Sequence, residues 1–377
     1  MRPQFMRIPY TDIAPSSASI PGFATTLPRA VTALCAFVAA PPPRGLPSSS
    51  VLLTGAGLSV PSGLADYRGA RGTYRVNKSY RPIYYPEFLA SHEARKRYWA
   101  RSFLGWPSLR KAQPNEAHYA IRDLGQLGLV RSVITQNVDS LHPRAHPDIP
   151  SLELHGYLRS TICTTCLAHF PRDEFQHHLA RLNPHWANLL KEALASGALD
   201  TDDPAERRFK GLRANPDGDV DLPQAPYTTF RYPPCPQCLA NPPKAPDGSK
   251  HTLHIDEQGA WIPPSTTGVL KPAVVMFGES IAHDVKTAAD EAIDGAGRLL
   301  ILATSLATYS AWRLAKRAKD RGMPIAIVSI GGVRGGDQLM AGIDPHQSGE
   351  LGLRVQIPTE QLLPALVSEL RKRLNNA

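Results

Sequence analysis

Four of the five cysteines fall into two pairs, each with two residues between its members. Cys163 and Cys166 form the first pair, and Cys235 and Cys238 form the second. Two such pairs can bring four thiolates to one tetrahedral metal ion, and zinc is the ion that this ligand set favours. Because four protein ligands leave no open position for water, we expect one structural zinc ion rather than a catalytic one.

A glycine-rich string follows directly on a short apolar run at residues 51–54. Gly55 and Gly57 would let the backbone approach a pyrophosphate at the start of a helix, where amide donors and the helix dipole favour anions. The third glycine, Gly63, comes too late for the usual dinucleotide pattern G-x-G-x-x-G. By itself, the glycine pair is equally compatible with a tight turn.

Polar side chains follow a second apolar run, at residues 130–135. Gln136, Asn137 and Asp139 could hold ribose hydroxyls and an amide at the end of a strand. His155 comes soon afterwards, directly before a glycine. A single histidine there is usually a turn or capping residue, but imidazole titrates near neutral pH and suits a general base. The neighbouring polar cluster favours the second interpretation.

Alternating strands and helices must position these residues. Apolar runs predict strands at 51–54, 130–135, 273–277, 299–303 and 325–329, and amphipathic patterns predict helices at 28–40, 116–127, 284–296 and 310–321. This alternation predicts an α/β fold, with a doubly wound, mostly parallel Rossmann-like sheet and a small inserted zinc-binding module. The ligand site should lie at the carboxyl ends of the strands.

The middle of the chain interrupts this alternation and sets the expected boundaries. We predict an N-terminal extension over residues 1–26, a Rossmann-like domain over 27–160 and 268–356, a zinc module over 161–267 and a C-terminal helix over 357–377. Within the module, one helical stretch is expected at 172–195. The polar, proline-rich insertion after the second cysteine pair is expected to be poorly ordered.

The string from Gly55 to Arg68 resembles the signature of the sirtuin family. In that family the loop holds the NAD pyrophosphate and folds over the nicotinamide ribose. The resemblance implies NAD contacts for Gly55, Ala56, Gly57, Ser59, Asp66, Tyr67 and Arg68. Gln136–Asp139 and His155 with its glycine resemble the family's catalytic core, and the cysteine pairs are similar to its small zinc module.

The resemblance implies an NAD-dependent protein-lysine deacylase. The acyl oxygen of the substrate would attack the anomeric carbon of the nicotinamide ribose, and the products would be lysine, nicotinamide and an O-acyl-ADP-ribose. His155 would be the general base on a ribose hydroxyl. Asn137, the second catalytic candidate, would contact the nicotinamide and ribose together with Gln136, Val138 and Asp139. The glycine loop and His155 would thus converge on one sugar.

Later segments extend the resemblance. Residues 270–279 resemble the strand that pairs with the acyl-lysine peptide, which implies substrate contacts for Val275, Phe277, Gly278 and Glu279. Such strand addition reads a peptide mainly through its backbone. Thr304, Ser305, Ser329 and Gly331 stand at further NAD positions. Ala303 and Ser329 replace the glycine and asparagine that are usual in the family, so we expect weaker NAD affinity.

Tyr98 and Arg101 resemble a feature of the class II, mitochondrial sirtuin-four-type branch, as does the segment at residues 216–220. Three residues apart, they lie on one helix face. In acyl-selective relatives such a pair meets the carboxylate of an acidic acyl group, which arginine can bind with two parallel hydrogen bonds. The same spacing is equally that of an ordinary packing pair.

Other functions compete with deacylation. A mono-ADP-ribosyltransferase or a lipoamidase could use the same scaffold, because another nucleophile or another acyl group could enter it. The net charge of +9 and the cysteine pairs also fit a zinc-ribbon chromatin or nucleic-acid module. Only Arg159 and His169 add basic character near the first pair, which disfavours that module. The late third glycine disfavours a hydride-transferring dehydrogenase.

Segment length and composition also bear on partners and location. The apolar stretch at residues 30–40 is well short of the roughly 20 residues that a spanning helix needs, so we expect no membrane partner. We expect a monomer that acts on acylated lysines of proteins, without nucleic acid. Residues 1–26 contain Arg2 and Arg7 but one acid, Asp12, which favours a mitochondrial matrix protein over a nuclear or cytoplasmic one.

Overall fold

Apolar strands form a parallel sheet in the computed structural model, which describes residues 17–77, 80–197, 199, 213–222, 225–245 and 248–376. The strands are β1 (Ser50–Thr54), β2 (Val130–Thr135), β3 (Ser151–Glu153), β11 (Arg298–Leu302), β12 (Ile325–Val328) and β13 (Gly352–Val355). Their order is β13-β12-β11-β1-β2-β3, and each neighbouring pair is parallel. The predicted mostly parallel sheet is confirmed.

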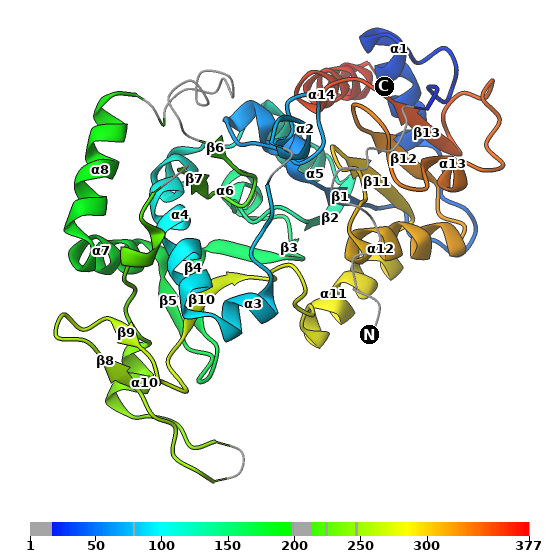
Figure 1. Cartoon of the computed structure of the whole chain (residues 1–377). Coiled ribbons are helices and arrows are strands. Elements are labelled where there is room, and N and C mark those ends of the chain that lie inside the picture. The colour runs from blue at the N-terminus through cyan, green and yellow to red at the C-terminus, as the bar shows by residue number, and fades with distance from the viewer. Residues whose placement is uncertain are drawn as a thin grey trace. The chain divides into compact units, whose positions relative to one another are not determined.

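Helices cover both faces of this sheet (Figure 1). Side chains on one face, among them Leu52, Val133 and Leu300, form a buried core with α1 (Leu27–Ala39), α5 (Glu116–Gln126) and α14 (Thr359–Asn375). On the other face α11 (His283–Asp294) contacts β2 and β3, and α12 (Tyr309–Asp320) contacts β11. Alternate residues of each strand therefore point to opposite helical layers, which is the doubly wound arrangement.

Shorter elements complete this part of the chain. They are the 3-10 helix η1 (Ala56–Ser62), α2 (Thr73–Val76), α6 (Leu141–Ala145) and α13 (Gly336–Leu339). Ile20 pairs with Arg354 through two backbone hydrogen bonds of 2.8 and 2.6 Å. Because an uncovered edge strand exposes unpaired amides, this contact protects the edge at β13. Residues 1–16 of the predicted extension lie outside the described residues.

A second group of elements contains the cysteines. Its three-stranded antiparallel sheet has the order β10-β4-β5, formed by β4 (Gly156–Cys163), β5 (His169–Pro171) and β10 (Leu270–Val274). The helices are α3 (Tyr85–Ala90), α4 (His92–Lys111), α7 (Arg172–Leu182), α8 (Pro184–Ala195), α10 (Pro236–Ala240) and the 3-10 helix η2 (Tyr227–Thr229). Two small pairings, β6 (Arg213–Ala214) with β7 (Val220–Asp221) and β8 (His254–Ile255) with β9 (Trp261–Ile262), complete it.

The chain divides into two compact units. Unit 1 takes the described residues up to Tyr80, Gln113–Leu154 and those from Ile281 onward, and unit 2 takes Arg81–Ala112 and the described residues from His155 to Ser280. The predicted boundaries had placed residues 81–112, 155–160 and 268–280 with the parallel sheet. They belong to unit 2 because α4 buries aromatic side chains such as Trp99 and Phe103 in the core that also contains the cysteines.

Two predicted elements of unit 2 were wrong. The strand expected at 273–277 in the parallel sheet is instead β10, which ends at Val274 and runs antiparallel to β4. A short apolar run cannot by itself tell which sheet it joins. The single helix expected at 172–195 is two helices, because Pro184 has no amide hydrogen and begins α8 after Asn183.

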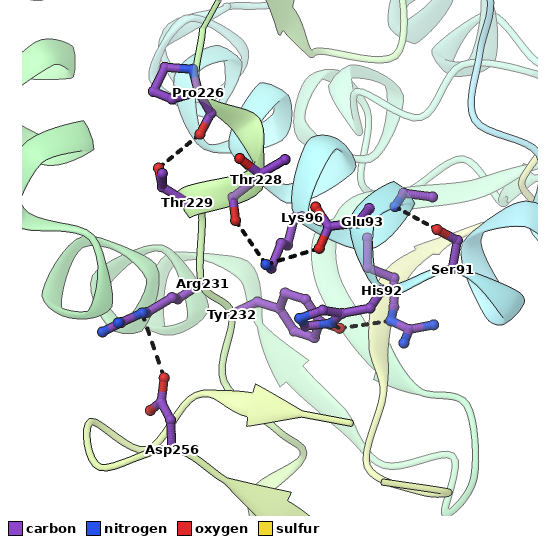
Figure 2. Close-up of polar contacts among 12 residues, drawn as sticks. Ser91, His92, Glu93, Lys96, Pro226, Thr228, Thr229, Arg231, Tyr232 and Asp256 are labelled. Atoms are coloured by element: carbon purple, nitrogen blue, oxygen red, sulfur yellow. Dashed lines mark hydrogen bonds and ion pairs between the residues drawn. The ribbon is translucent and has the colours of Figure 1, made fainter. Parts of the chain in front are cut away.

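The insertion after the second cysteine pair, which we expected to be poorly ordered, contains the β8–β9 hairpin in its described part. Trp261 anchors it: the ring is 4% exposed, and its Nε1 donates to Thr267 O at 2.9 Å. Tyr232 stacks on Trp261, and the Arg95 guanidinium lies 4.6 Å from the indole centroid. Tyr232 Oη also accepts from Arg95 Nε. The same hydroxyl contacts His92 Nδ1, and both His92 and Tyr232 are labelled in Figure 2. Burial of a large aromatic ring orders this insertion.

Among the helices in the described part of the chain, none is long and apolar enough to cross a membrane.

Candidate active site

The glycine loop lies where the strand order of unit 1 reverses. The chain continues from β1 to β2 and β3 on one side, while β11 and its successors lie on the other. In open α/β sheets, ligands bind beyond the carboxyl ends of the strands at such a point. Gly57 N donates to Ala303 O at 3.1 Å, and a Cβ on Gly55 would lie 2.5 Å from Thr304 Cβ. Glycine is therefore required for this close approach of the backbone, with Ala56 between the two glycines.

The polar residues after β2 hold the glycine loop in place through hydrogen bonds within unit 1. Asn137 Nδ2 donates to Gly55 O and to Ser59 Oγ, both at 3.1 Å. Ser59 Oγ in turn donates to Asp139 Oδ2 at 2.7 Å. Burial raises the pKa of Asp139, opposed by the hydrogen bonds from Leu141 N and Ser59. The predicted residues Ser59, Asn137 and Asp139 thus form one hydrogen-bonded group, with Val138 between the last two.

Gln136 links the ends of three elements. Its Nε2 donates to Thr54 O at 3.2 Å and to Thr304 Oγ1 at 2.9 Å. Its Oε1 accepts from Thr308 Oγ1 at 3.1 Å, and Thr308 is also the N-cap of α12. Thr308 was not among the predicted site residues. A capping threonine directly before an amphipathic helix is the signal that could have found it.

The segment after the glycine loop carries the other predicted NAD residues. Asp66 accepts from Gly69 N at 3.0 Å, and burial raises the pKa of its carboxyl group. Tyr67 packs against Tyr74 with ring centroids 5.5 Å apart, and the Arg68 guanidinium lies 5.0 Å from the centre of the Tyr74 ring. Arg68 Nε is buried and makes no hydrogen bond among the described residues. An unused buried donor on a cation suits an anionic ligand, because leaving it unsatisfied is costly.

The remaining NAD candidates lie at the ends of β11 and β12. Thr304 and Ser329 are buried, Ser305 O accepts from Arg334 N at 2.9 Å, and Gly331 has φ of +88°. Ala303 has φ of +49°, in the left-handed region that favours glycine. The alanine that departs from the family pattern therefore occupies a strained position.

Three histidines lie under the glycine loop. His142 Nε2 lies 2.9 Å from Thr54 Oγ1, and its Nδ1 lies 2.9 Å from His146 Nε2. The His118 ring centroid is 5.0 Å from that of His142. Burial lowers the pKa of all three, that of His118 to about 3. These side chains are therefore neutral at physiological pH and act as internal supports for the end of β1.

In unit 2, His155 is bonded through its backbone to the candidate peptide strand. Val275 N donates to His155 O at 2.8 Å, directly after β10. The next residue, Gly156, has φ of +74°, and a Cβ there would lie 2.2 Å from Ala273 O. Leu154, the last residue of unit 1 before this junction, donates from its amide to Thr135 O at 2.8 Å. The predicted general base is thus held by backbone bonds next to the predicted substrate residue Val275.

Glu279 was predicted as a substrate residue, but its carboxylate contacts residues of its own segment. Its Oε2 accepts from Met276 N at 2.9 Å and lies 3.1 Å from Lys271 Nζ. Phe277 O accepts from Tyr85 N at 2.8 Å, and Gly278 has φ of +84°. Lys271 was missed as a site residue. A lysine in an otherwise apolar strand with a carboxylate soon after it is the available signal.

Tyr98 and Arg101 both lie on α4, as predicted, but Arg101 contacts a carboxylate of the chain itself. Arg101 Nη2 lies 2.6 Å from Asp219 Oδ2, and the two side chains are 7% and 11% exposed. Tyr98 packs against Phe88, with ring centroids 5.4 Å apart, and burial raises its pKa. A Cβ on Gly105 would lie 2.1 Å from Gly218 O, so the segment carrying Asp219 approaches α4 closely.

The four paired cysteines come together in unit 2. One sulfur atom from each lies within 4.8 Å of the other three, with Cys163–Cys238 and Cys166–Cys235 distances of 3.6 Å. Tetrahedral zinc–thiolate bonds of about 2.3 Å place sulfurs about 3.8 Å apart, so the group fits zinc. Thr165 N and Cys238 N point at Cys163 Sγ and Cys235 Sγ. The fifth cysteine, Cys35, is buried in α1.

Comparisons with known proteins agree with this arrangement. The model of the Sir2 family matches residues 55–310. An NAD-dependent protein deacylase of Batrachochytrium dendrobatidis is 37% identical over 329 residues, covering 85% of this chain and 90% of that protein. An NAD-dependent protein deacylase of Arabidopsis thaliana is also 37% identical, covering 85% and 75%. The mitochondrial NAD-dependent protein lipoamidase sirtuin-4 of Bos taurus is 32% identical, covering 80% and 79%.

Solved structures support the fold. A Sir2 homologue in complex with ADP-ribose has a TM-score of 0.53 at 22% identity, covering 91% of this chain and 96% of that one. A Sir2 protein bound to a propionylated peptide has a TM-score of 0.51 at 21% identity, covering 86% and 93%. Together with the extended matches to the family model and to the deacylases, these findings confirm the predicted relationship: the chain belongs to the Sir2 family, the sirtuins.

Proposed function

We propose that the chain is an NAD-dependent protein-lysine deacylase that releases nicotinamide and transfers the acyl group to ADP-ribose. One observation of the structure carries the proposal: Val275 N donates to His155 O, which joins the only histidine of the family motif to the segment we assign to peptide binding. A general base and the substrate backbone must keep a fixed relation for proton transfer to be efficient. This bond fixes the backbone of His155 relative to that segment.

Unit 1 supplies the residues for NAD. The loop from Gly55 to Ser59 approaches Ala303 and Thr304, after β11, closely enough to exclude side chains at Gly55 and Gly57, and Arg68 has a buried donor for an anion. We assign the pyrophosphate to these residues, and the nicotinamide and ribose to Asn137 and Asp139. When bound, NAD supplies an anomeric carbon that becomes electrophilic as nicotinamide departs. We also assign to the NAD site the other predicted positions, which are Gln136, Thr304, Ser305, Ser329 and Gly331.

His155 has the role of general base. Its imidazole would accept the proton of a ribose hydroxyl, and the acyl-lysine peptide would pair with the backbone at Val275 and Phe277. Phe277 O already accepts from Tyr85 N, so pairing on that side is limited to the remaining backbone groups. Recognition through the backbone predicts loose preference for the sequence around the lysine.

The four cysteines would hold one zinc ion with a structural role. All four ligand positions of a tetrahedral ion would come from the chain, which leaves no position for substrate. Cys163, Cys235 and Cys238 are buried in the core of unit 2, so metal binding and folding of this unit should be coupled.

For the acyl group, the structure favours neutral chains over acidic ones. The Arg101 guanidinium is already neutralised by Asp219, so an acidic acyl group would have to displace a carboxylate of the chain. The relative from Bos taurus is named a lipoamidase, and lipoyl is a long neutral acyl group. We therefore rank acetyl and lipoyl lysine ahead of glutaryl-type lysine. For location we propose the mitochondrion, since that relative is named mitochondrial, with the protein acting as a monomer.

The test is a panel of acetyl-, lipoyl- and glutaryl-lysine peptides incubated with NAD, with mass spectrometry of the products. Deacylation gives O-acyl-ADP-ribose and free lysine, whereas the alternative activity gives ADP-ribosylated protein. His155→Ala should abolish turnover while retaining zinc and the unfolding midpoint. His254→Ala, at an exposed histidine in β8, is the matched control and should turn over normally. Normal turnover by His155→Ala would show that the assigned mechanism is wrong.

A further inference from the structure

An ion pair between the buried Lys271 and the partly buried Glu279 flanks the segment that follows β10, next to His155. Lys271 is 8% exposed, and its Nζ lies 3.1 Å from Glu279 Oε2. Nζ also donates to Pro272 O at 3.1 Å and to Val274 O at 2.6 Å. One ammonium group thus has three oxygen partners, which is the full number that its three hydrogens can serve. All three lie on the strand or on the turn that follows it.

These bonds fix the backbone on both sides of Val275. Lys271 holds the carbonyl of Val274, at the irregular point of β10 where the register with β4 shifts. Glu279 Oε2 holds the amide of Met276 at 2.9 Å. Between them, Val275 N donates to His155 O. The ion pair therefore determines the path of the chain where it meets the histidine.

We propose that the Lys271–Glu279 pair is a positioning device for substrate, which sets the backbone at residues 274–277 so that an acyl-lysine peptide can add to it in register with His155. The inference rests on the proposed function. Burial lowers the pKa of Lys271 and the Glu279 carboxylate opposes that change. A charged pair in this environment binds its partners more strongly than neutral groups would, and loss of either member leaves the other, which is at least partly buried, without its opposite charge.

The experiment compares Lys271→Met, Glu279→Gln and the double variant in steady-state deacylation of an acetyl-lysine peptide. We expect KM for the peptide to rise at least tenfold in each single variant, with kcat within threefold and KM for NAD within twofold of the wild-type values. Because the two residues act as one unit, the double variant should lose no more than the worse single variant. Glu279→Gln keeps the size of the side chain and an acceptor for Met276 N, so it tests the role of charge if Lys271→Met is poorly folded.

Lys96→Met is the matched control. Lys96, on α4, also pairs with a carboxylate, Glu93, at 3.0 Å and donates to a carbonyl, Thr228 O, at 2.8 Å, and neither partner belongs to β10 or the turn after it (Figure 2). Its peptide KM should stay within twofold of wild type. An unchanged peptide KM in both Lys271→Met and Glu279→Gln, or an equal rise in the KM of peptide and NAD, would overturn the positioning role while leaving the deacylase intact. A wild-type protein that releases no nicotinamide with any acyl peptide would overturn the proposed function and this inference with it.

Discussion

Replacing Gly156 with alanine should destabilise the protein and weaken peptide use, because the substitution meets two independent obstacles. The first is the backbone conformation: φ is +74°, where an alanine costs about 1–2 kcal/mol. The second is space, since the new Cβ would lie 2.2 Å from Ala273 O and 2.9 Å from Val274 Cα. Both neighbours are backbone atoms of β10 and cannot rotate away.

Forcing a methyl group into a closely packed site costs about 1–3 kcal/mol. The smaller conformational entropy of alanine in the unfolded chain returns about 0.4–1 kcal/mol. The free energy of unfolding should therefore fall by about 1–5 kcal/mol, which is considerable beside the about 5–15 kcal/mol that is typical of folded proteins. The β10 backbone must also move from β4, which disturbs the bond between Val275 N and His155 O.

The assay is denaturant unfolding, followed by deacylation kinetics at a temperature where the variant is folded. Gly259→Ala is the control, because Gly259 has φ of +86° in the same unit but no atom within 4 Å of its ideal Cβ. In this variant the free energy of unfolding should fall only by the cost of the left-handed backbone conformation, and the peptide KM should stay unchanged. If Gly156→Ala loses no more stability than Gly259→Ala, the close approach of β10 does not restrict this position and the reasoning fails.

Three further changes follow from other parts of the structure. Ala303→Gly should raise the free energy of unfolding by about 0.5 kcal/mol, because glycine removes the strain of the left-handed conformation. This gain exceeds the loss from the greater conformational entropy of glycine in the unfolded chain. A lower denaturation midpoint would contradict this. Cys235→Ser should reduce bound zinc, measured by elemental mass spectrometry, and lower the unfolding midpoint, whereas full zinc content would argue against the four-cysteine site. The buried histidines should make the protein acid-sensitive: the pKa of His118 is about 3 in the folded state and about 6.5 when unfolded, so its stabilising contribution is complete above pH 6.5 and is lost as the pH falls towards 3. In His118→Gln, urea unfolding at pH 8 and pH 4 should differ less than in the wild type, and an unchanged difference would exclude this histidine as a cause.

Sequence patterns were sufficient wherever a local rule links residue type to structure. Periodicity placed β1, β2, β11 and β12 and the helices around them, because a buried parallel strand needs a continuous apolar run and a covering helix needs an apolar face. The cysteine spacing predicted the cluster found in unit 2, since two residues between ligands suit a tetrahedral ion. The long motif at Gly55–Arg68 identified the family, which the comparisons confirmed.

Only the tertiary structure decided which partner each side chain would meet. The sequence shows Arg101 and Asp219 as two distant charges, yet folding pairs them at 2.6 Å and changes the expected choice of acyl group. Likewise, Glu279 could face a substrate or its own chain, and the approach of Lys271 settles its direction. The first contact depends on the packing of α4 against the segment at β7, and the second on the turn that follows β10. Long-range packing, unlike strand or helix periodicity, leaves no regular pattern along the sequence.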